Sequence, residues 1–124
     1  MLWRTYWNSR MEEQSFMKDH YPSEKFNAAV RALATGLDPL QKRLGAAFNS
    51  GLYPLLEHLD KLPESAREKL ERYQAASNMV DDPGKEGTIN VWANGLSDEE
   101  AKEIALWIVE TAFELEADFW SANA

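Results

Sequence analysis

The sequence predicts an all-α fold, namely a single-domain orthogonal bundle of five or six helices with one long ordered loop, about residues 78–97, before the last helix. Apolar side chains recur three or four residues apart in most of the segments that Gly and Pro residues separate. Only residues 88–92 have the β-branched and aromatic composition of a strand, and one strand cannot make a sheet. With 124 residues, 44% of them hydrophobic, the chain can bury a core, and we assign residues 1–124 to one helical domain.

The first helix is expected over residues 2–18, where three of the first seven residues of the chain are aromatic, namely Trp3, Tyr6 and Trp7. Trp3 and Trp7 are four residues apart, so their rings share one helix face. We therefore expect residues 1–20 to form an aromatic helix that packs on the bundle. The alternative is an aromatic arm that grips a partner.

Two more helices should follow, each introduced by a proline. Pro22 belongs in a first turn, and Gly36 marks the end of that helix. Asp38 and Pro39 then predict a second start, in which the aspartate caps the helix and the proline occupies its first turn. The predicted apolar faces are Phe26, Ala29, Val30, Leu33, Ala34 and Leu37 in one helix, and Leu40, Leu44, Ala47 and Phe48 in the other.

A further helix is expected to begin near Pro54, after residues 49–51 end or kink the preceding one. His58 lies in this helix and is expected to be an ordinary histidine at the edge of the bundle. Pro63 ends the helix, and residues 64–77 form a charged helix whose thin apolar stripe places it on the outside of the bundle. The apolar stripe before Pro63 consists of Leu52, Leu55, Leu56, Leu59 and Leu62.

Helical periodicity fails over residues 78–97, which contain three glycines and a proline. Asp82, Pro83 and Gly84 predict a turn, and residues 88–92 predict a short extended segment that lies across the bundle. Ordered loops of this length are uncommon in compact domains and are often functional. The loop is therefore a candidate for partner binding.

The last helix should start at a capping box of Ser97 and Glu100 and run to about Phe119 or Trp120. At 100° per residue, its apolar side chains form two stripes. The core seam is predicted to hold Ala101, Ile104, Ala105, Ile108, Ala112, Leu115 and Phe119. The second stripe holds Leu106, Val109, Phe113 and Trp120. A helix with two apolar stripes is either central to the bundle or half buried against a second subunit, so the second stripe is a possible dimer face.

An acidic row occupies the far side of the same helix and consists of Glu99, Glu103, Glu110 and Glu114. Residues 98–118 contain eight acidic residues against one basic residue, Lys102, a local charge of −7. Trp107 is expected just beyond the row, on the solvent side. The row is either a solvated face that keeps the protein soluble or a docking face for a basic protein. Like charges four residues apart are mildly destabilising, and no lysine relieves Glu110 and Glu114, which argues for docking.

The net charge of −8 is confined to the second half of the chain. Residues 63–124 contain fourteen acidic and five basic residues, a charge of −9, whereas residues 1–62 contain seven and eight, a charge of +1. Such a field repels nucleic acid and anionic lipid and attracts basic protein surfaces. No run of about 20 apolar residues predicts a spanning helix, and the first residues lack the apolar run of a signal peptide. We expect a cytoplasmic protein that binds neither membrane nor nucleic acid directly.

Catalytic and metal-binding signatures are absent from the sequence. The lack of cysteine excludes disulfides, iron–sulfur clusters, thiolate zinc and cysteine nucleophiles. His20 and His58 have no second ligand at metal spacing, and His20 is expected at a helix end where a cation suits the helix dipole. The acidic residues of 81–86 lack the alternate spacing of a calcium loop. We expect no enzyme activity, no metal and no cofactor.

The function that these features favour is that of a small acidic binding protein that docks a basic protein. Two settings fit it: an immunity or antitoxin-type inhibitor of a toxin, and a phage-type inhibitor of a nucleic-acid-binding defence complex. The alternative is a non-catalytic assembly subunit that acts as a homo-oligomer through the second stripe and the N-terminal aromatic residues. The candidate partner-binding residues are Glu99, Glu103, Trp107, Glu110 and Glu114 in the last helix, and Asp81, Asp82, Glu86 and Trp92 in the loop.

Overall fold

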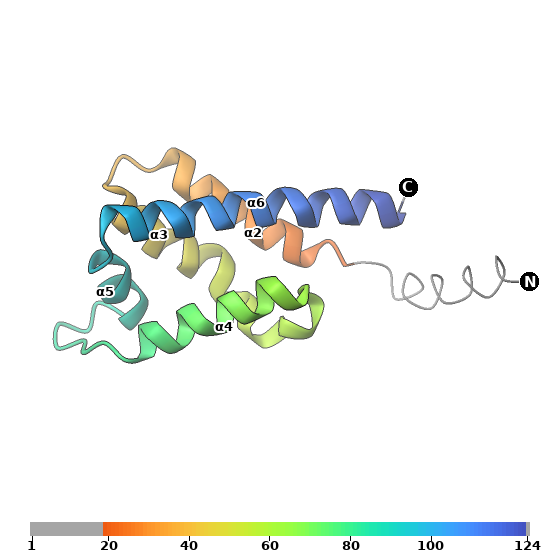
Figure 1. Cartoon of the computed structure of the whole chain (residues 1–124). Helices are drawn as coiled ribbons and strands as arrows, with labels where there is room; N and C mark the ends of the chain where they lie inside the picture. The colour runs from red at the N-terminus through yellow and green to blue at the C-terminus, as the bar shows by residue number, and fades with distance from the viewer. Residues whose placement is uncertain (1–18, 124) are drawn as a thin grey trace, which may run out of the picture.

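The computed structural model describes residues 19–123, and within this range the chain forms five α-helices and no strand (Figure 1). The all-α prediction is therefore confirmed. The helix predicted over residues 2–18, with its aromatic rings, lies outside the described residues. The elements are α2 (Tyr21–Thr35), α3 (Leu40–Ala47), the π-helical segment η1 (Phe48–Leu52), the 3₁₀-helical segment η2 (Tyr53–Lys61), α4 (Glu64–Asn78), α5 (Thr88–Asn94) and α6 (Asp98–Asn123).

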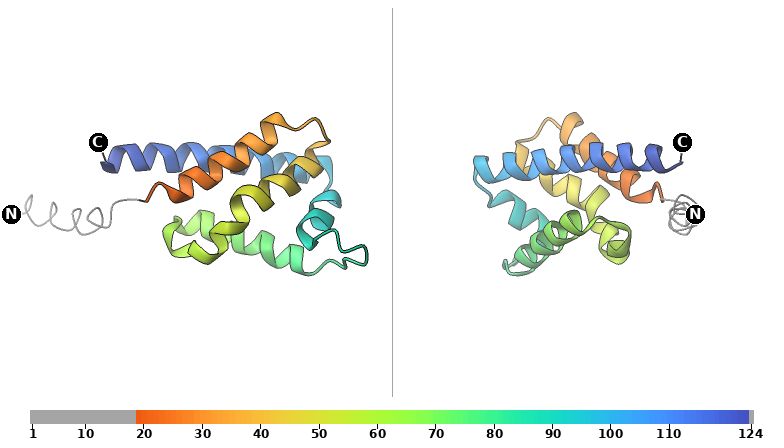
Figure 2. Two further views of the ribbon diagram at one scale, coloured as in Figure 1. Left: turned by 180° about the vertical axis from the view of Figure 1, so that it is seen from behind. Right: turned by 45° about the vertical axis from the view of Figure 1, so that its right-hand side comes forward.

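The long helix α6 lies along α2, and α3 with η1 runs from this pair toward α4 on the opposite side (Figures 1 and 2). The short helix α5 closes the end of the bundle at which α6 begins. The start of α2 lies beside the end of α6. The ring of His20 stacks there on that of Phe119, with 4.2 Å between centroids. α6 packs on α2 and α3, while its side chains Leu106 and Phe113 are exposed.

The core is one cluster of buried apolar side chains to which every element contributes. Its largest fully buried members are Phe26, Leu44, Leu52, Leu55, Leu70 and Ile108. The predicted faces of α2 and α3 are confirmed at their central positions, although Leu37 is exposed and Ala34 lies at the surface. Of the stripe before Pro63, Leu52, Leu55 and Leu62 are buried, and Leu56 and Leu59 are half-buried.

Gly51 lies in η1, where the sequence predicted a kink or helix end after α3, and it allows η1 to pack closely on α2. A Cβ atom at this position would lie 2.3 Å from the carbonyl oxygen of Lys25 and 2.9 Å from the amide nitrogen of Ala29, both on the backbone of α2. Only glycine allows α2 and η1 to approach this closely. Pro54 lies in the first turn of η2, as predicted.

The predicted aspartate cap of α3 is wrong. Pro39 occupies the cap position and no side chain bonds to the free N–H groups there. The backbone carbonyl of Asp38 instead accepts a hydrogen bond from Nε of Arg43 at 2.8 Å. The carboxylate of Asp38 lies 3.9 Å from Nζ of Lys42.

The prediction of an extended segment at residues 88–92 is also wrong, because these residues form the helix α5. The loop before α6 is therefore divided in two by a helix. Ile89 and Ala93 are buried four residues apart on one helix face, and the ring of Trp92 packs beside them. Tertiary burial of this face outweighs the strand propensity of the β-branched residues.

A carboxylate sets the start of α5. The side chain of Asp82 accepts hydrogen bonds from the N–H groups of Glu86 at 2.8 Å and Gly87 at 2.7 Å. Gly87 has a φ of 100°, a value that favours glycine, and the chain enters the helix from this residue. The turn predicted at Asp82 is thus a structural support for α5.

None of the helices within residues 19–123 combines the length and the apolar composition that crossing a membrane requires.

Candidate protein-binding surface on α6

The start of α6 is the capping box that the sequence predicts. The Ser97 N–H donates to Oε1 of Glu100 at 2.9 Å, and the Glu100 N–H donates to Oγ of Ser97 at 3.1 Å. The first of these bonds is the main reason why the pKa of the Glu100 carboxyl lies below its ordinary value. The core seam is confirmed, with Ala105 and Phe119 half-buried and the other members buried; they are Ala101, Ile104, Ile108, Ala112 and Leu115.

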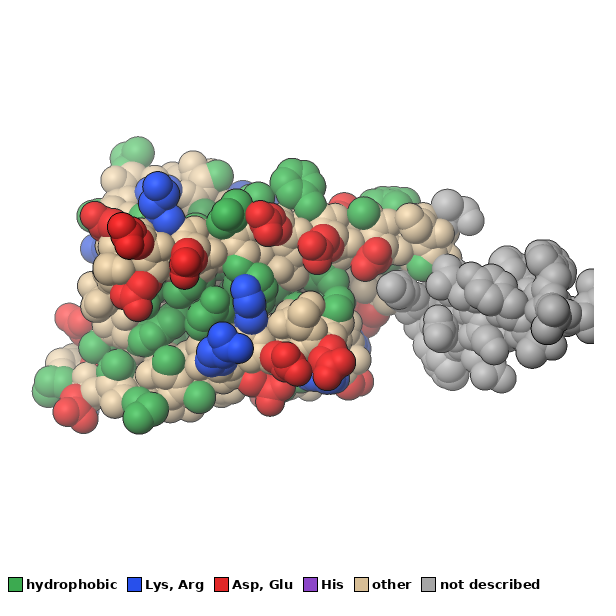
Figure 3. Space-filling model, viewed as in Figure 1, with side chains coloured by type: hydrophobic (Ala, Val, Ile, Leu, Met, Phe, Trp, Pro, Cys, Tyr) green, Lys and Arg blue, Asp and Glu red, His purple; other side chains and the backbone are tan. Residues whose placement is uncertain are grey.

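The acidic row faces solvent along α6 (Figure 3). Its members, which we call the acidic row throughout, are Glu99, Glu103, Glu110 and Glu114, and each is exposed. Within residues 19–123 none of them forms an ion pair, and the neighbouring Lys102 forms none either. The row spans sixteen residues, and its ends lie about 22 Å apart at the α-helical rise. No described cation therefore lies at ion-pair distance from the row.

Trp107 does not lie on the solvent side as predicted. Its side chain is half-buried and contacts rings from two other helices, Phe26 at 5.5 Å and Tyr73 at 5.3 Å between centroids. The helix wheel places Trp107 beside the acidic row, but α4 lies close enough to α6 to cover that edge. Burial raises the pKa of Tyr73, and the nearby Glu103 carboxylate contributes in the same direction.

Of the loop candidates, Asp81, Asp82 and Glu86 precede α5 and Trp92 lies within it, at the end of the bundle where α6 begins (Figures 1 and 2). Asp81 and Glu86 are exposed, as a partner contact requires. Asp82 is occupied with the backbone of the loop. Trp92 is half-buried, and its ring contacts Phe48 at 5.4 Å and Tyr73 at 5.8 Å. Trp92 is linked to α6 indirectly, because Tyr73 contacts both its ring and that of Trp107.

The second apolar stripe of α6 is turned to solvent. Leu106 is 58% exposed and Phe113 is 72% exposed, whereas Val109 is half-buried. Trp120 is 57% exposed, but its indole N–H donates to Oε1 of Glu116 at 3.1 Å. The interpretation that α6 is central to the bundle is therefore wrong for this stripe. Figure 3 shows hydrophobic side chains along the edge of α6 next to its acidic residues.

An apolar groove of about 750 Å³ lies between α2 and α6. We call it the α2–α6 groove. Its α2 side consists of Val30, Leu33 and Ala34, with Leu40 of α3 beside them, and its α6 side includes Ala105, Leu106 and Val109. Glu99, Lys102 and Glu103 complete the lining. Two members of the acidic row and two of the exposed stripe thus share one concave surface, which the sequence did not reveal.

A cluster around Glu116, which no sequence pattern indicates, joins the start of α2 to the end of α6. Its carboxylate lies 3.1 Å from Nε2 of His20 and accepts hydrogen bonds from Oγ of Ser23, from Asn27 at 3.4 Å and from Trp120. These bonds, with Ser23 and then His20 the largest contributions, lower the pKa of Glu116 to about 2. No periodicity in the sequence links residues this far apart.

His20 occupies the cap position at the start of α2, an end at which a cation does not suit the helix dipole. The helix that was predicted to end near His20 lies outside the described residues. The ring of His20 is held in place by Glu116, by Glu24 at 3.4 Å and by stacking on Phe119. The trio of Ser23, His20 and Glu116 is no hydrolase triad. In such a triad the imidazole lies between hydroxyl and carboxylate, whereas here the buried serine bonds to the carboxylate itself.

Replacing Glu116 with glutamine is expected to lower the free energy of unfolding at pH 7 by about 1 kcal/mol, allowing for the partial exposure of the carboxylate. The pKa of Glu116 is lowered in the folded state, so its stabilisation is present above the ordinary value of 4.5 and is lost as the pH falls toward about 2. The difference between wild type and variant should therefore shrink over this window. Urea unfolding at pH 7, 4 and 2 measures it.

Glu114→Gln is the matched control, because Glu114 lies on the same helix and is exposed. Asp19 and Glu100 also have lowered pKa values, Asp19 chiefly through its 2.6 Å bond to Lys61, so the wild type alone cannot isolate Glu116. A difference between Glu116→Gln and wild type that is independent of pH contradicts the assignment.

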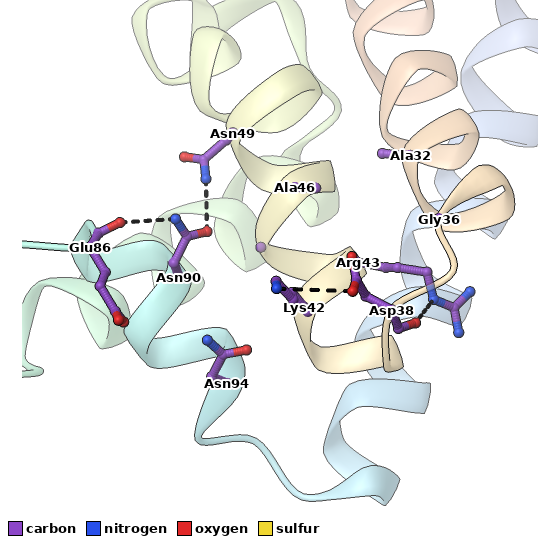
Figure 4. Close-up of a pocket in the computed structure, with 11 residues that line it drawn as sticks. Ala32, Gly36, Asp38, Lys42, Arg43, Ala46, Asn49, Glu86, Asn90 and Asn94 are labelled. Atoms are coloured by element: carbon purple, nitrogen blue, oxygen red, sulfur yellow. Dashed lines mark hydrogen bonds and ion pairs between the residues drawn. The ribbon is translucent and has the colours of Figure 1, made fainter.

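A second, polar pocket of about 530 Å³ lies where α2 and α3 meet α5 (Figure 4). Its polar side chains are largely engaged with the protein itself. Asn90 accepts a hydrogen bond from Asn49 at 3.0 Å and donates one to the carbonyl of Glu86 at 3.0 Å. Arg43 donates to the carbonyl oxygen of Leu33 at 2.6 Å. We interpret this pocket as the junction that fixes α5 on α3.

Residues 19–123 contain no group of three or more acidic or histidine side chains placed to hold a metal ion. Comparisons with protein-family models, with curated proteins and with solved structures find no match to this chain.

Proposed function

We propose that this protein is a cytoplasmic binding module that docks a basic protein through the acidic row of α6. The settings that we favour are an immunity or antitoxin-type inhibitor of a basic toxin, and a phage-type inhibitor of a nucleic-acid-binding defence complex. The observation that carries the proposal is the acidic row itself, four exposed carboxylates on about 22 Å of rigid helix with no cation paired to them among the described residues.

Rigid placement makes such a row an efficient recruiting surface. Charges on a helix keep their spacing without a loss of backbone entropy on binding, and a field of one sign raises the association rate of an oppositely charged partner by 10-fold or more. Glu99–Glu103 and Glu110–Glu114 are like-charge pairs four residues apart, each of which mildly destabilises the helix. A cationic partner would relieve both pairs.

The partner class follows from the charge and the neighbouring surface. Nucleic acid and anionic lipid share the sign of the row and are repelled by it. A basic protein surface brings lysine and arginine together with apolar contacts, and the α6 surface offers both carboxylates and the exposed side chains of Leu106 and Phe113. This combination supports a protein partner over a small cation.

A second candidate function is that of a homo-oligomeric assembly subunit. It is favoured by one observation, the exposure of Leu106, Phe113 and Trp120 on one edge of α6. Sedimentation of the full chain over a range of concentrations tests it. A dimer that dissociates on Phe113→Ser replacement supports self-association, and a monomer at all concentrations rules it out.

The docking proposal is tested by photo-crosslinking in the native host, with the crosslinker placed at position 110, followed by purification of the captured protein. We expect a basic protein whose association rate falls steeply with salt. Glu110→Lys/Glu114→Lys should then slow association about 10-fold or more at low ionic strength, with a smaller effect at high salt. Stopped-flow mixing with the purified partner measures both rates.

The matched control is Glu68→Lys/Glu71→Lys, which makes the same change in net charge at two exposed positions of α4. It should slow association far less, because the reversed charges lie on another helix. Equal effects of the two double variants would show that net charge alone acts. An unchanged rate for Glu110→Lys/Glu114→Lys rules out the acidic row.

A further inference from the structure

We infer that the α2–α6 groove seats an amphipathic helix of the basic partner, with apolar side chains in the groove and lysine or arginine side chains along the acidic row. This inference rests on the proposed function and specifies what part of the partner is recognised. It combines the groove, the exposed stripe and the acidic row in one binding site.

The acidic row and the exposed stripe are adjacent along the whole outer face of α6. Leu106 follows Glu103 by three residues and precedes Glu110 by four, and Phe113 follows Glu110 by three. Residues three or four apart are neighbours on a helix surface. Each exposed apolar side chain therefore has a carboxylate next to it, and a partner that covers one meets the other.

The groove continues this surface toward α2. Val30 and Ala34 lie four residues apart on α2, and Ala105 and Val109 lie four apart on α6, so both walls repeat at helical spacing. A groove with two such walls fits a third helix with anchors at positions i, i+3, i+4 and i+7. The charged members of the lining, Glu99, Lys102 and Glu103, all lie on the α6 side.

The charged residues beside the groove indicate which kind of helix can bind in it. The partner helix needs its cations on the flank that faces α6, because the acidic row runs along that flank only. Lys102 is the one cation of the groove lining, and it is outnumbered by Glu99 and Glu103. A second copy of this chain is disfavoured, since each copy carries a net charge of −8 and an acidic row of its own.

The test uses synthetic 18-residue helical peptides and the full chain. The probe carries leucine at i, i+3, i+4 and i+7 with lysine on one flank, and its control has the same composition in scrambled order without an apolar face. We expect the ordered peptide to bind at least 10-fold more tightly by fluorescence anisotropy. Ala34→Trp, which fills the groove from an exposed position, should remove most of this preference.

Ala75→Trp is the matched control, because Ala75 is exposed on α4 and is not part of the groove lining. It should leave the affinity for the ordered peptide unchanged. Glu99→Lys/Glu103→Lys should weaken both peptides, since both depend on charge.

Three results would overturn the inference. Equal affinity for ordered and scrambled peptides shows that charge recruits the partner without the groove, and the docking function then stands. Dimers that Ala34→Trp dissociates assign the groove to a second copy. Tighter binding of a peptide of residues 1–18 than of the basic probe assigns it to this chain's own N-terminal segment. Failure of the docking function itself is seen separately, in the crosslinking experiment.

Discussion

Replacing Phe26 with alanine is expected to lower the free energy of unfolding by about 3–5 kcal/mol. The Phe26 ring is fully buried on the face of α2 that meets the rest of the bundle. It also contacts the indole of Trp107 edge to face, at 5.5 Å between centroids. The substitution therefore removes a large apolar side chain, leaves a cavity and deprives Trp107 of its support from α2.

Urea or guanidinium unfolding of the full chain measures this loss. Leu37→Ala is the control, since Leu37 is exposed in the turn after α2 and its replacement should change stability by less than about 0.5 kcal/mol. A loss below about 1 kcal/mol for Phe26→Ala would mean that α2 and α6 do not share the core described above.

Gly51→Ala is expected to destabilise the protein by about 1–3 kcal/mol or more, although it adds only one methyl group. The new Cβ would lie 2.3 Å from the carbonyl oxygen of Lys25 and 2.9 Å from the amide nitrogen of Ala29. Both are backbone atoms of α2, so no side-chain rotation relieves the clash, and the two elements must move apart.

Gly84→Ala is the matched control for this prediction. A Cβ at Gly84 would meet only the Glu86 side chain, at 3.7 Å, which is an ordinary contact. Thermal unfolding should show a clear drop in midpoint for Gly51→Ala and almost none for Gly84→Ala. Equal midpoints for the two variants would contradict the close approach of α2 and η1.

Both positions bear on the proposed binding surface, because α2 forms one wall of the α2–α6 groove. Phe26 supports α2 from the α6 side, and Gly51 lets η1 pack against it on another side. A variant that shifts α2 should therefore weaken the ordered peptide even though neither residue lines the groove. Charge recruitment by Glu110 and Glu114 on α6 should be less sensitive to the same shift.

The sequence by itself determined the all-α class, most of the helix limits and the inward seam of α6. These features depend on local chemistry: the prolines at residues 22, 54 and 63, the capping box at Ser97 and the helical spacing of apolar residues. Such signals act over one or two helical turns, so they can be recognised in the sequence without knowledge of the residues that pack against them. The exposure of the acidic row was predicted for the same reason.

Only the tertiary structure decided which residues have neighbours from elsewhere in the chain. Residues 88–92 are helical because Ile89 and Ala93 are both buried in the core from one helix face. Trp107 and Trp92 are half-buried because Tyr73 of α4 packs against both rings. Whether a side chain is buried depends on which other element packs against it, and the sequence pattern of one helix does not show this.

The same limit applies to the site. The acidic row and the exposed stripe were visible as periodic patterns of a single helix. The α2–α6 groove and the Glu116 cluster were not, because each is formed by residues from opposite ends of the chain, such as Ser23 and Glu116. Periodicity determines which face a side chain occupies, and the packing of α2 on α6 decides whether that face meets solvent, another helix or a groove.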